Sequence, residues 1–242
     1  MPITTVLFDL DDTLYGDFKT CNRLGLENCA AYAAEHCGVS AETFLTAVQN
    51  SKAALQKRLP AEPEMHDRVL YMQGALELLG LPAIRHAEPL HDIYWNTLYE
   101  KMYLREGVPE LLDALRARGV KIVCCTNMLV AVQMRKLCLL GLDDRIDYLV
   151  TSEEAGRDKP EPPIFELALQ KAGCTPAEAL MVGDNFDHDI VGAHRVGIPG
   201  VWLHIHPEAQ PTAAIPYWEA KDFPQAAQIV LEQWERNRYH AL

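Results

Sequence analysis

The sequence predicts an α/β protein, built on a parallel sheet, that carries an all-helical insert. From about residue 107 onward, short apolar runs alternate with amphipathic segments, the pattern of repeated strand–helix units. Before that point, an apolar run at residues 6–8 reads as a buried strand, and only helical patterns follow it. We therefore expect an α/β core of residues 1–17 and 105–242 and a helical domain of residues 18–104.

Four helical patterns account for the insert. Apolar residues recur in them at three- to four-residue spacing, and the patterns stop near glycine or proline. The expected helices span residues 20–37, 41–59, 69–79 and 88–102. Tyr94, Trp95 and Tyr99, on the last of them, are assigned to the interior of the insert. Together these patterns predict a small helical bundle placed directly after the first strand.

The later part of the chain supplies four further strands. Each is a continuous apolar run, which is typical of a parallel sheet covered by helices on both faces. The expected strands span residues 120–125, 148–150, 179–182 and 200–203. Helices are expected before Gly119 and Gly141, over 164–172, before Gly197 and over 224–237.

Composition excludes several classes of partner. The formal net charge of −12 argues against a nucleic-acid polymer or an anionic membrane, because both need a basic surface on the protein. No apolar run approaches the ~20 residues of a membrane span, and the N-terminus lacks the pattern of a signal peptide. The seven cysteines fit no zinc spacing and read as reduced structural thiols. We expect a cytoplasmic protein, and its charge is compatible with a small phosphorylated ligand.

Reactive side chains follow the predicted strands at their carboxyl ends, where ligands bind in sheets of this kind. Carboxylates crowded at the end of a buried strand repel one another and call for a cation, which suits a divalent metal and chemistry at phosphorus. Each motif alone is also typical of a turn, a helix cap or a solvated loop, but their joint order favours a site. In chain order the residues are Asp9, Asp11, Asp12, Thr126, Asn127, Lys159 and Asp184.

In this order the motifs resemble those of the haloacid dehalogenase superfamily. The matching stretches are Asp9-Leu10-Asp11-Asp12-Thr13, Thr126-Asn127, Lys159-Pro160 and the segment from Gly183 to Asp189. The resemblance implies a Rossmann-like core with an inserted helical cap domain. The stretch from Thr126 to Leu169 is similar to phosphatases that act on nucleoside monophosphates or sialic-acid 9-phosphate.

The resemblance also implies how the carboxylates work. Asp9 would attack the phosphoryl group and form an aspartyl-phosphate. Asp11 would protonate the leaving oxygen and then activate the hydrolytic water. Mg²⁺ would be held by the Asp9 side chain, the backbone carbonyl of Asp11 and the Asp184 side chain.

The other matching residues would serve the phosphate and the metal. Thr126, Asn127 and Lys159 would bind the phosphate oxygens. Asp189 would support the metal and Lys159 from outside the ligand set. Met128 stands where relatives often have glycine, and its backbone N–H would face the phosphate.

The leading hypothesis is a Mg²⁺-dependent phosphomonoester hydrolase that acts on a small phosphorylated metabolite, with a nucleoside 5′-monophosphate favoured. A 2-haloacid dehalogenase of the same fold is the nearest alternative, but it has no use for Asp11 as acid/base or for the metal. A phosphomutase and a non-catalytic protein that binds a phosphate ligand are further alternatives. His204 and His206 have ligand-like spacing without a third ligand, so both are assigned to the surface or the core.

Overall fold

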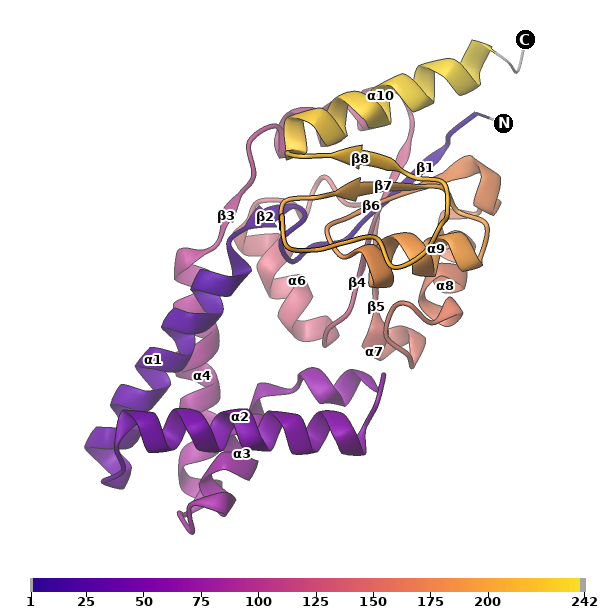
Figure 1. Ribbon diagram of the computed structural model, residues 1–242. Helices are drawn as coiled ribbons and strands as arrows, with labels where there is room; N and C mark the ends of the chain where they lie inside the picture. Colours follow the sequence, from indigo (N-terminus) through magenta and orange to yellow (C-terminus); the bar gives the residue numbers. More distant parts are fainter. Residues whose placement is uncertain (1, 240–242) are drawn as a thin grey trace. The chain divides into compact units, whose positions relative to one another are not determined.

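The computed structural model describes residues 2–239, and the chain divides into two compact units. One unit comprises Met1–Gly16 with Tyr103–Leu242, and the other comprises Asp17–Met102. The first has helices around a sheet, and the second is formed by helices (Figure 1). None of the described helices is both long and apolar enough to cross a membrane.

A six-stranded sheet in which all neighbouring strands run parallel forms the centre of the α/β unit, and it confirms the predicted fold class. The strands are β1 (Thr5–Phe8), β4 (Lys121–Thr126), β5 (Tyr148–Thr151), β6 (Ala179–Gly183), β7 (Gly200–Leu203) and β8 (Trp218–Ala220). Their order in the sheet is β5-β4-β1-β6-β7-β8. The order of the strands reverses at β1, because β4 and β5 lie on one side of it and β6, β7 and β8 on the other. In such sheets a ligand binds at the reversal, outside the carboxyl ends of the strands.

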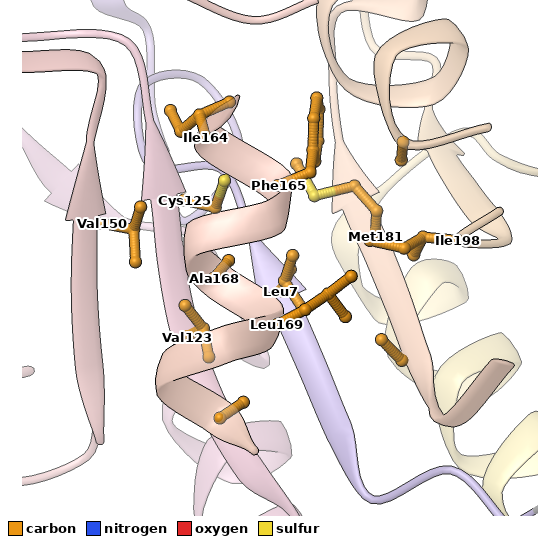
Figure 2. Packing of buried hydrophobic residues seen from close by; sticks show 13 residues of the cluster. Leu7, Val123, Cys125, Val150, Ile164, Phe165, Ala168, Leu169, Met181 and Ile198 are labelled. Atoms are coloured by element: carbon orange, nitrogen blue, oxygen red, sulfur yellow. The ribbon is translucent and has the colours of Figure 1, made fainter. Parts of the chain in front are cut away.

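Helices cover both faces of this sheet. They are α5 (Val108–Ala117), α6 (Val130–Leu139), α7 (Ser152–Ala155), α8 (Pro162–Ala172), α9 (Gly192–Arg195) and α10 (Phe223–Tyr239). Figure 2 shows Phe165 and Leu169 of α8 packed against Leu7 of β1 and Met181 of β6. Burying side chains of this size stabilises the fold by about 1.5–3 kcal/mol each. This packing fixes the central strands and therefore the chain that follows them.

The helical unit consists of four long helices and one short 3₁₀ helix, Pro63–His66. The long helices are α1 (Phe18–Cys37), α2 (Ala41–Arg58), α3 (Arg68–Leu78) and α4 (Ala83–Lys101). Local signals set their ends: Ser40 accepts the N–H of Thr43 at the start of α2, and Gly38 ends α1 with a φ of 69°. Tyr94 and Trp95 are buried, as predicted, whereas Tyr99 is half-buried.

Several elements differ from the predictions. Helix α4 starts at Ala83 and contains Pro89 in its interior. A proline there usually kinks or breaks a helix, so a helix that begins before it is difficult to predict from the sequence. Strand β8 was missed because it has three residues and no continuous apolar run. A two-residue antiparallel pair, β2 (Tyr15–Gly16) with β3 (Tyr103–Leu104), was also missed for its shortness.

Candidate active site

The predicted reactive residues gather around the carboxyl end of β1. This strand ends at Phe8, whose partners across the ladder are Cys124 of β4 and Val182 of β6. The backbone N–H of Asp9 donates to the carbonyl oxygen of Val182 at 2.9 Å, so Asp9 is fixed directly after the strand. Because β4 and β6 flank β1, the residues that follow the three strands share one end of the sheet.

Lys159 is the charged centre of this site. Its Nζ lies 2.7 Å from Asp9 Oδ1, 2.6 Å from Asp189 Oδ1 and 2.9 Å from the carbonyl oxygen of Cys125. These bonds use the three hydrogens of the ammonium group. Lys159 is 3% exposed, Asp9 7% and Asp189 1%, so water screens these ion pairs little.

The buried charges shift the ionisation of their neighbours. Burial raises the pKa of Asp9 well above its ordinary value, although the positive charge of Lys159 opposes the rise. The carboxylates of Asp189 and Asp184 raise the Asp9 pKa further. Burial would lower the pKa of Lys159, but the charges of Asp189 and Asp9 raise it well above its ordinary value. One ammonium group therefore does not balance the carboxylates, and the charged form of Asp9 calls for another cation.

Thr13 connects Asp9 to Asp184, which follows β6. The buried Thr13 hydroxyl lies 3.3 Å from Asp9 Oδ2 and 3.2 Å from Asp184 Oδ1, and it accepts the backbone N–H of Asp184 at 3.1 Å. Oxygen atoms of Asp9, Asp184 and Asp189 lie within 4.8 Å of one another. Hard oxygen donors of this kind suit Mg²⁺, so a divalent cation could bind at this cluster.

A glycine lets Asp189 reach this cluster. A Cβ atom on Gly183 would lie 2.2 Å from Asp189 Oδ2, so no larger residue fits there without displacing the carboxylate. Asp189 lies on a π-helical turn, Phe186–Val191, where the sequence predicted a regular helix. Such turns are frequent at functional sites. The backbone N–H of Asn185 donates to Asp189 Oδ2 at 3.0 Å and fixes its orientation.

The second motif contacts Lys159 from the end of β4. Asn127 Oδ1 accepts the backbone N–H of Lys159 at 2.7 Å, and Asn127 Nδ2 donates to the carbonyl oxygen of Lys159 at 3.0 Å. The Asn127 side chain therefore holds the backbone at Lys159. That Asn127 binds phosphate stays a prediction. The expectation for Met128 is wrong, because its backbone N–H donates to Ser152 Oγ at 3.1 Å.

Asp11 has partners that the sequence analysis did not identify. Lys136 Nζ lies 2.5 Å from Asp11 Oδ1, and Gln133 Nε2 lies 2.7 Å from Asp11 Oδ2. The hydroxyl of Tyr15 also donates to Asp11 Oδ1. Burial would raise the pKa of Asp11, but the charge of Lys136 and the hydrogen bonds from all three partners lower it.

Local backbone geometry explains why Asp9 and Asp11 have different partners. In an extended chain, side chains two residues apart point the same way. The chain turns instead, because the N–H groups of Thr13 and Leu14 donate to the carbonyl oxygen of Leu10 at 3.3 and 3.0 Å. Asp9 thus contacts Lys159, whereas Asp11 contacts α6.

The sequence does contain a signal for the α6 residues. Gln133 and Lys136 are three positions apart, on the buried face of α6 that also carries Val132 and Leu137. Lysine and glutamine are seldom fully buried without a polar partner. Two polar residues on an apolar helix face therefore indicate a buried polar partner elsewhere in the chain.

A second group of ligand-type atoms lies beside the first. Asp12, Asp184 and His206 each place one such atom within 4.8 Å of the others. His206 Nε2 lies 3.4 Å from Asp184 Oδ2, and this hydrogen bond raises the pKa of His206. His206 is therefore a neighbour of the candidate metal ligands. His204 instead stacks on Trp202, with the ring centroids 3.9 Å apart.

Comparisons with known proteins agree with the fold. Residues 3–197 match the family described as haloacid dehalogenase-like hydrolase. The chain is 37% identical over 212 residues to ribulose-1,5-bisphosphate 5-phosphatase of Halopiger xanaduensis, which covers 86% of this chain and 88% of that protein. It is 30% identical over 238 residues to pyrimidine 5′-nucleotidase YjjG of Escherichia coli, which covers 93% of this chain and 96% of that protein.

A solved structure of a related protein has a similar fold. The crystal structure of a HAD phosphatase from Thermococcus onnurineus matches with a TM-score of 0.73 at 25% identity, over 94% of this chain and 97% of that chain. The family match spans most of the sequence, including all four strand-end motifs. These findings confirm the resemblance: the chain belongs to the haloacid dehalogenase-like hydrolases.

Proposed function

We propose that this hydrolase cleaves a phosphomonoester through an aspartyl-phosphate on Asp9. The observation that carries the proposal is the buried charge arrangement around Asp9. Lys159 contacts Asp9 at 2.7 Å, while Asp184 and Asp189 complete a carboxylate cluster. This arrangement favours a dianionic ester and a metal over a 2-haloacid, because a dehalogenase has no need of the additional carboxylates.

The donor set fits Mg²⁺. Asp9, Asp184 and the backbone carbonyl of Asp11 would hold the ion, and all of these ligands are hard oxygen atoms. When bound, Mg²⁺ offsets the negative charges that would otherwise keep Asp9 and the phosphate apart. The fit rests on the spacing of the carboxylates and on the need of charged Asp9 for a further cation.

The chain's own residues then account for both chemical steps. In the first, an oxygen of Asp9 forms a bond to phosphorus, the ester P–O bond breaks, and the leaving oxygen takes a proton from Asp11. In the second, Asp11 takes a proton from water, the water oxygen bonds to phosphorus, and the Asp9–phosphorus bond breaks. Proton transfer of this kind contributes roughly 10²–10⁴-fold to the rate.

Two groups are available for the phosphate oxygens. Thr126 is 1% exposed, and its hydroxyl oxygen accepts Gln133 Nε2 at 2.7 Å, so its own hydrogen remains to be donated. Lys159 supplies a positive charge beside Asp9. We assign to Asn127 the role of holding the Lys159 backbone, in addition to any contact with phosphate.

The proposed substrate is a small phosphorylated metabolite, with a nucleoside 5′-monophosphate as the first candidate. The likeness to a pyrimidine 5′-nucleotidase over nearly the full chain supports this choice. A sugar phosphate is the second candidate, because a relative at 37% identity is named as a ribulose-bisphosphate phosphatase. We assign selection of the leaving group to the helical unit, Asp17–Met102, as the cap domain.

Phosphate release from a panel of nucleoside monophosphates, sugar phosphates and phosphorylated acids, with Mg²⁺ or with EDTA, tests the proposal. We expect turnover that depends on Mg²⁺ and is abolished by Asp9→Asn in a protein that stays folded. Asp113→Asn is the matched control, since Asp113 is exposed and paired with Arg145 at 2.8 Å. Full activity of the Asp9→Asn variant would overturn the mechanism.

A further inference from the structure

We propose that Gln133 and Lys136 of α6 are positioning residues that hold the Asp11 carboxylate and the Thr126 hydroxyl in one network. The inference rests on the proposed function, because it concerns residues to which that function gives the acid/base and phosphate-binding roles. It adds two residues that lie outside the four strand-end motifs.

The network holds both oxygen atoms of Asp11. Lys136 Nζ lies 2.5 Å from Oδ1, and Gln133 Nε2 lies 2.7 Å from Oδ2. Lys136 and Gln133 each have an exposed fraction of 0%. The carboxylate therefore cannot rotate about its last bond without losing a charged or a buried hydrogen bond.

Gln133 also joins Asp11 to the phosphate-binding motif. Its Nε2 donates to Asp11 Oδ2 and to Thr126 Oγ1, each at 2.7 Å, which uses both amide hydrogens. The opposite orientation of the amide would set Gln133 Oε1 against the Asp11 carboxylate. Asp11 thus fixes the Gln133 amide, and the amide leaves Thr126 with its hydroxyl hydrogen to donate.

Packing alone does not account for these two residues. Their neighbours on the same helix face, Val132 and Leu137, are apolar and buried. Gln133 Oε1 is buried and has no hydrogen-bond partner among residues 2–239, a cost that a methionine or leucine would avoid. A buried lysine likewise costs stability unless its charge is paired. Polar side chains at these positions are therefore best explained by the Asp11 carboxylate and the Thr126 hydroxyl that they hold in place.

The consequence is a kinetic one. If the pair acts through Asp11, its loss slows formation of the aspartyl-phosphate to an extent that depends on the leaving group, because Asp11 protonates that group. Hydrolysis of the common aspartyl-phosphate is slowed equally for every substrate, so the two effects are separated by kcat/KM, which reports only the steps up to departure of the leaving group. An alkyl phosphate needs its leaving oxygen protonated, whereas p-nitrophenyl phosphate has a leaving group that departs without a proton. A purely structural role would slow both substrates alike.

The test compares Lys136→Met, Gln133→Met and Arg135→Met, the last a matched control because Arg135 is exposed on the same helix. We expect Lys136→Met to lower kcat/KM by about tenfold or more on an alkyl phosphate and by about threefold or less on p-nitrophenyl phosphate. Its KM should stay within about twofold, whereas Gln133→Met should also raise KM through the lost orientation of Thr126.

A double-mutant cycle with Asp11→Asn supplies the second readout. Adding Lys136→Met to Asp11→Asn should change kcat on the alkyl phosphate by no more than about twofold, because residues that act as a unit are not additive. Full additivity, or equal losses of kcat/KM on both substrates, would overturn the inference. If Lys136→Met fails to fold, the same cycle is measured with Gln133→Met in its place, and the same outcomes support or overturn the inference.

Failure of the inference is distinguishable from failure of the proposed function. A wild-type protein that releases no phosphate from any ester, or an Asp9→Asn variant with full activity, refutes the proposed function and the inference with it. An active wild type and an inactive Asp9→Asn variant, with Lys136→Met and Gln133→Met both behaving like Arg135→Met, refute the inference alone.

Discussion

Replacement of Lys159 by methionine is the sharpest test of the charge arrangement. The substitution keeps the length and most of the volume of the side chain but leaves Asp9 and Asp189, which are 7% and 1% exposed, without their common cation. Removing one partner of a buried ion pair destabilises a protein by about 3–5 kcal/mol. For a chain of this length that corresponds to a fall of roughly 6–20 °C in Tm.

The assay is thermal unfolding in EDTA, together with phosphate release in Mg²⁺. We expect Lys159→Met to lose activity by about 10²–10³-fold, the usual cost of removing one group that stabilises the charge of a transition state. Adding Asp189→Asn to Lys159→Met should recover part of the lost stability, because one of the two uncompensated carboxylates becomes neutral.

Lys171→Met provides the matched control for this experiment. Lys171 pairs with Glu154 at 2.6 Å, but both side chains are partly exposed, so the pair is worth only about 0–1 kcal/mol. The reasoning is refuted if Lys159→Met unfolds at the same temperature as Lys171→Met. It is equally refuted if Asp189→Asn lowers the stability of the Lys159→Met protein further.

Three further predictions concern other parts of the chain. In EDTA, Asp9→Asn should be more stable than the wild type at neutral pH, because the pKa of Asp9 is raised in the folded protein and its ionisation therefore disfavours folding. The difference in stability should shrink as the pH falls towards the pKa of Asp9 in the unfolded chain, and urea unfolding at a series of pH values would measure it. Gly183→Ala should weaken Mg²⁺ affinity in a binding titration by about 10–100-fold, because its Cβ would lie 2.2 Å from Asp189 Oδ2. Gly25→Ala should lower the free energy of unfolding by about 1–3 kcal/mol, since its Cβ would lie 2.9 Å from the Tyr94 ring, with phosphate binding unaffected as the check on specificity.

The sequence predicts the elements and the charge centre well because both depend on local signals. The strands of the sheet are continuous apolar runs, and a parallel sheet brings the residues that follow them to one end. Lys159 and Asp9 are 150 positions apart, yet this rule places both at the same end of the sheet. Strand β8 lacks such a run, and its place at the edge of the sheet depends on β7, with which it pairs.

The partners of Asp11 could not be predicted in the same way. Whether Lys136 faces Asp11 depends on the rotation of α6 about its axis and on the turn after β1, and neither is determined by local sequence. The turn at Leu10 directs Asp11 away from the extended path that two-residue spacing suggests. Polar residues on the buried face of α6 reveal that a partner exists but do not identify it.

The environments of Asp9 and Asp11 shift the pKa values of these two carboxyl groups in opposite directions. Burial raises the pKa of Asp9, whereas Lys136 and its neighbours lower that of Asp11. Paired groups whose environments push their pKa values apart are typical of acid–base sites. In the proposed mechanism, a cation bound beside Asp9 would favour the charged form of this carboxyl group, which is the form that attacks phosphorus.

Asp11 in its present contacts is charged, and a charged carboxylate is a base. This state suits the second step, in which Asp11 takes a proton from water, better than the first, in which it must give one. The first step therefore requires that Asp11 be protonated against the preference of its three donors. A substrate whose leaving group needs no proton avoids that requirement, so its first step should be faster than that of an alkyl phosphate. Replacing Asp11 by asparagine should widen this difference in the first step and should slow the second step equally for both substrates. Comparing the burst of leaving group with the steady-state rate for p-nitrophenyl phosphate separates these steps: a burst in Asp11→Asn, followed by slow turnover, is expected if Asp11 acts mainly as the base.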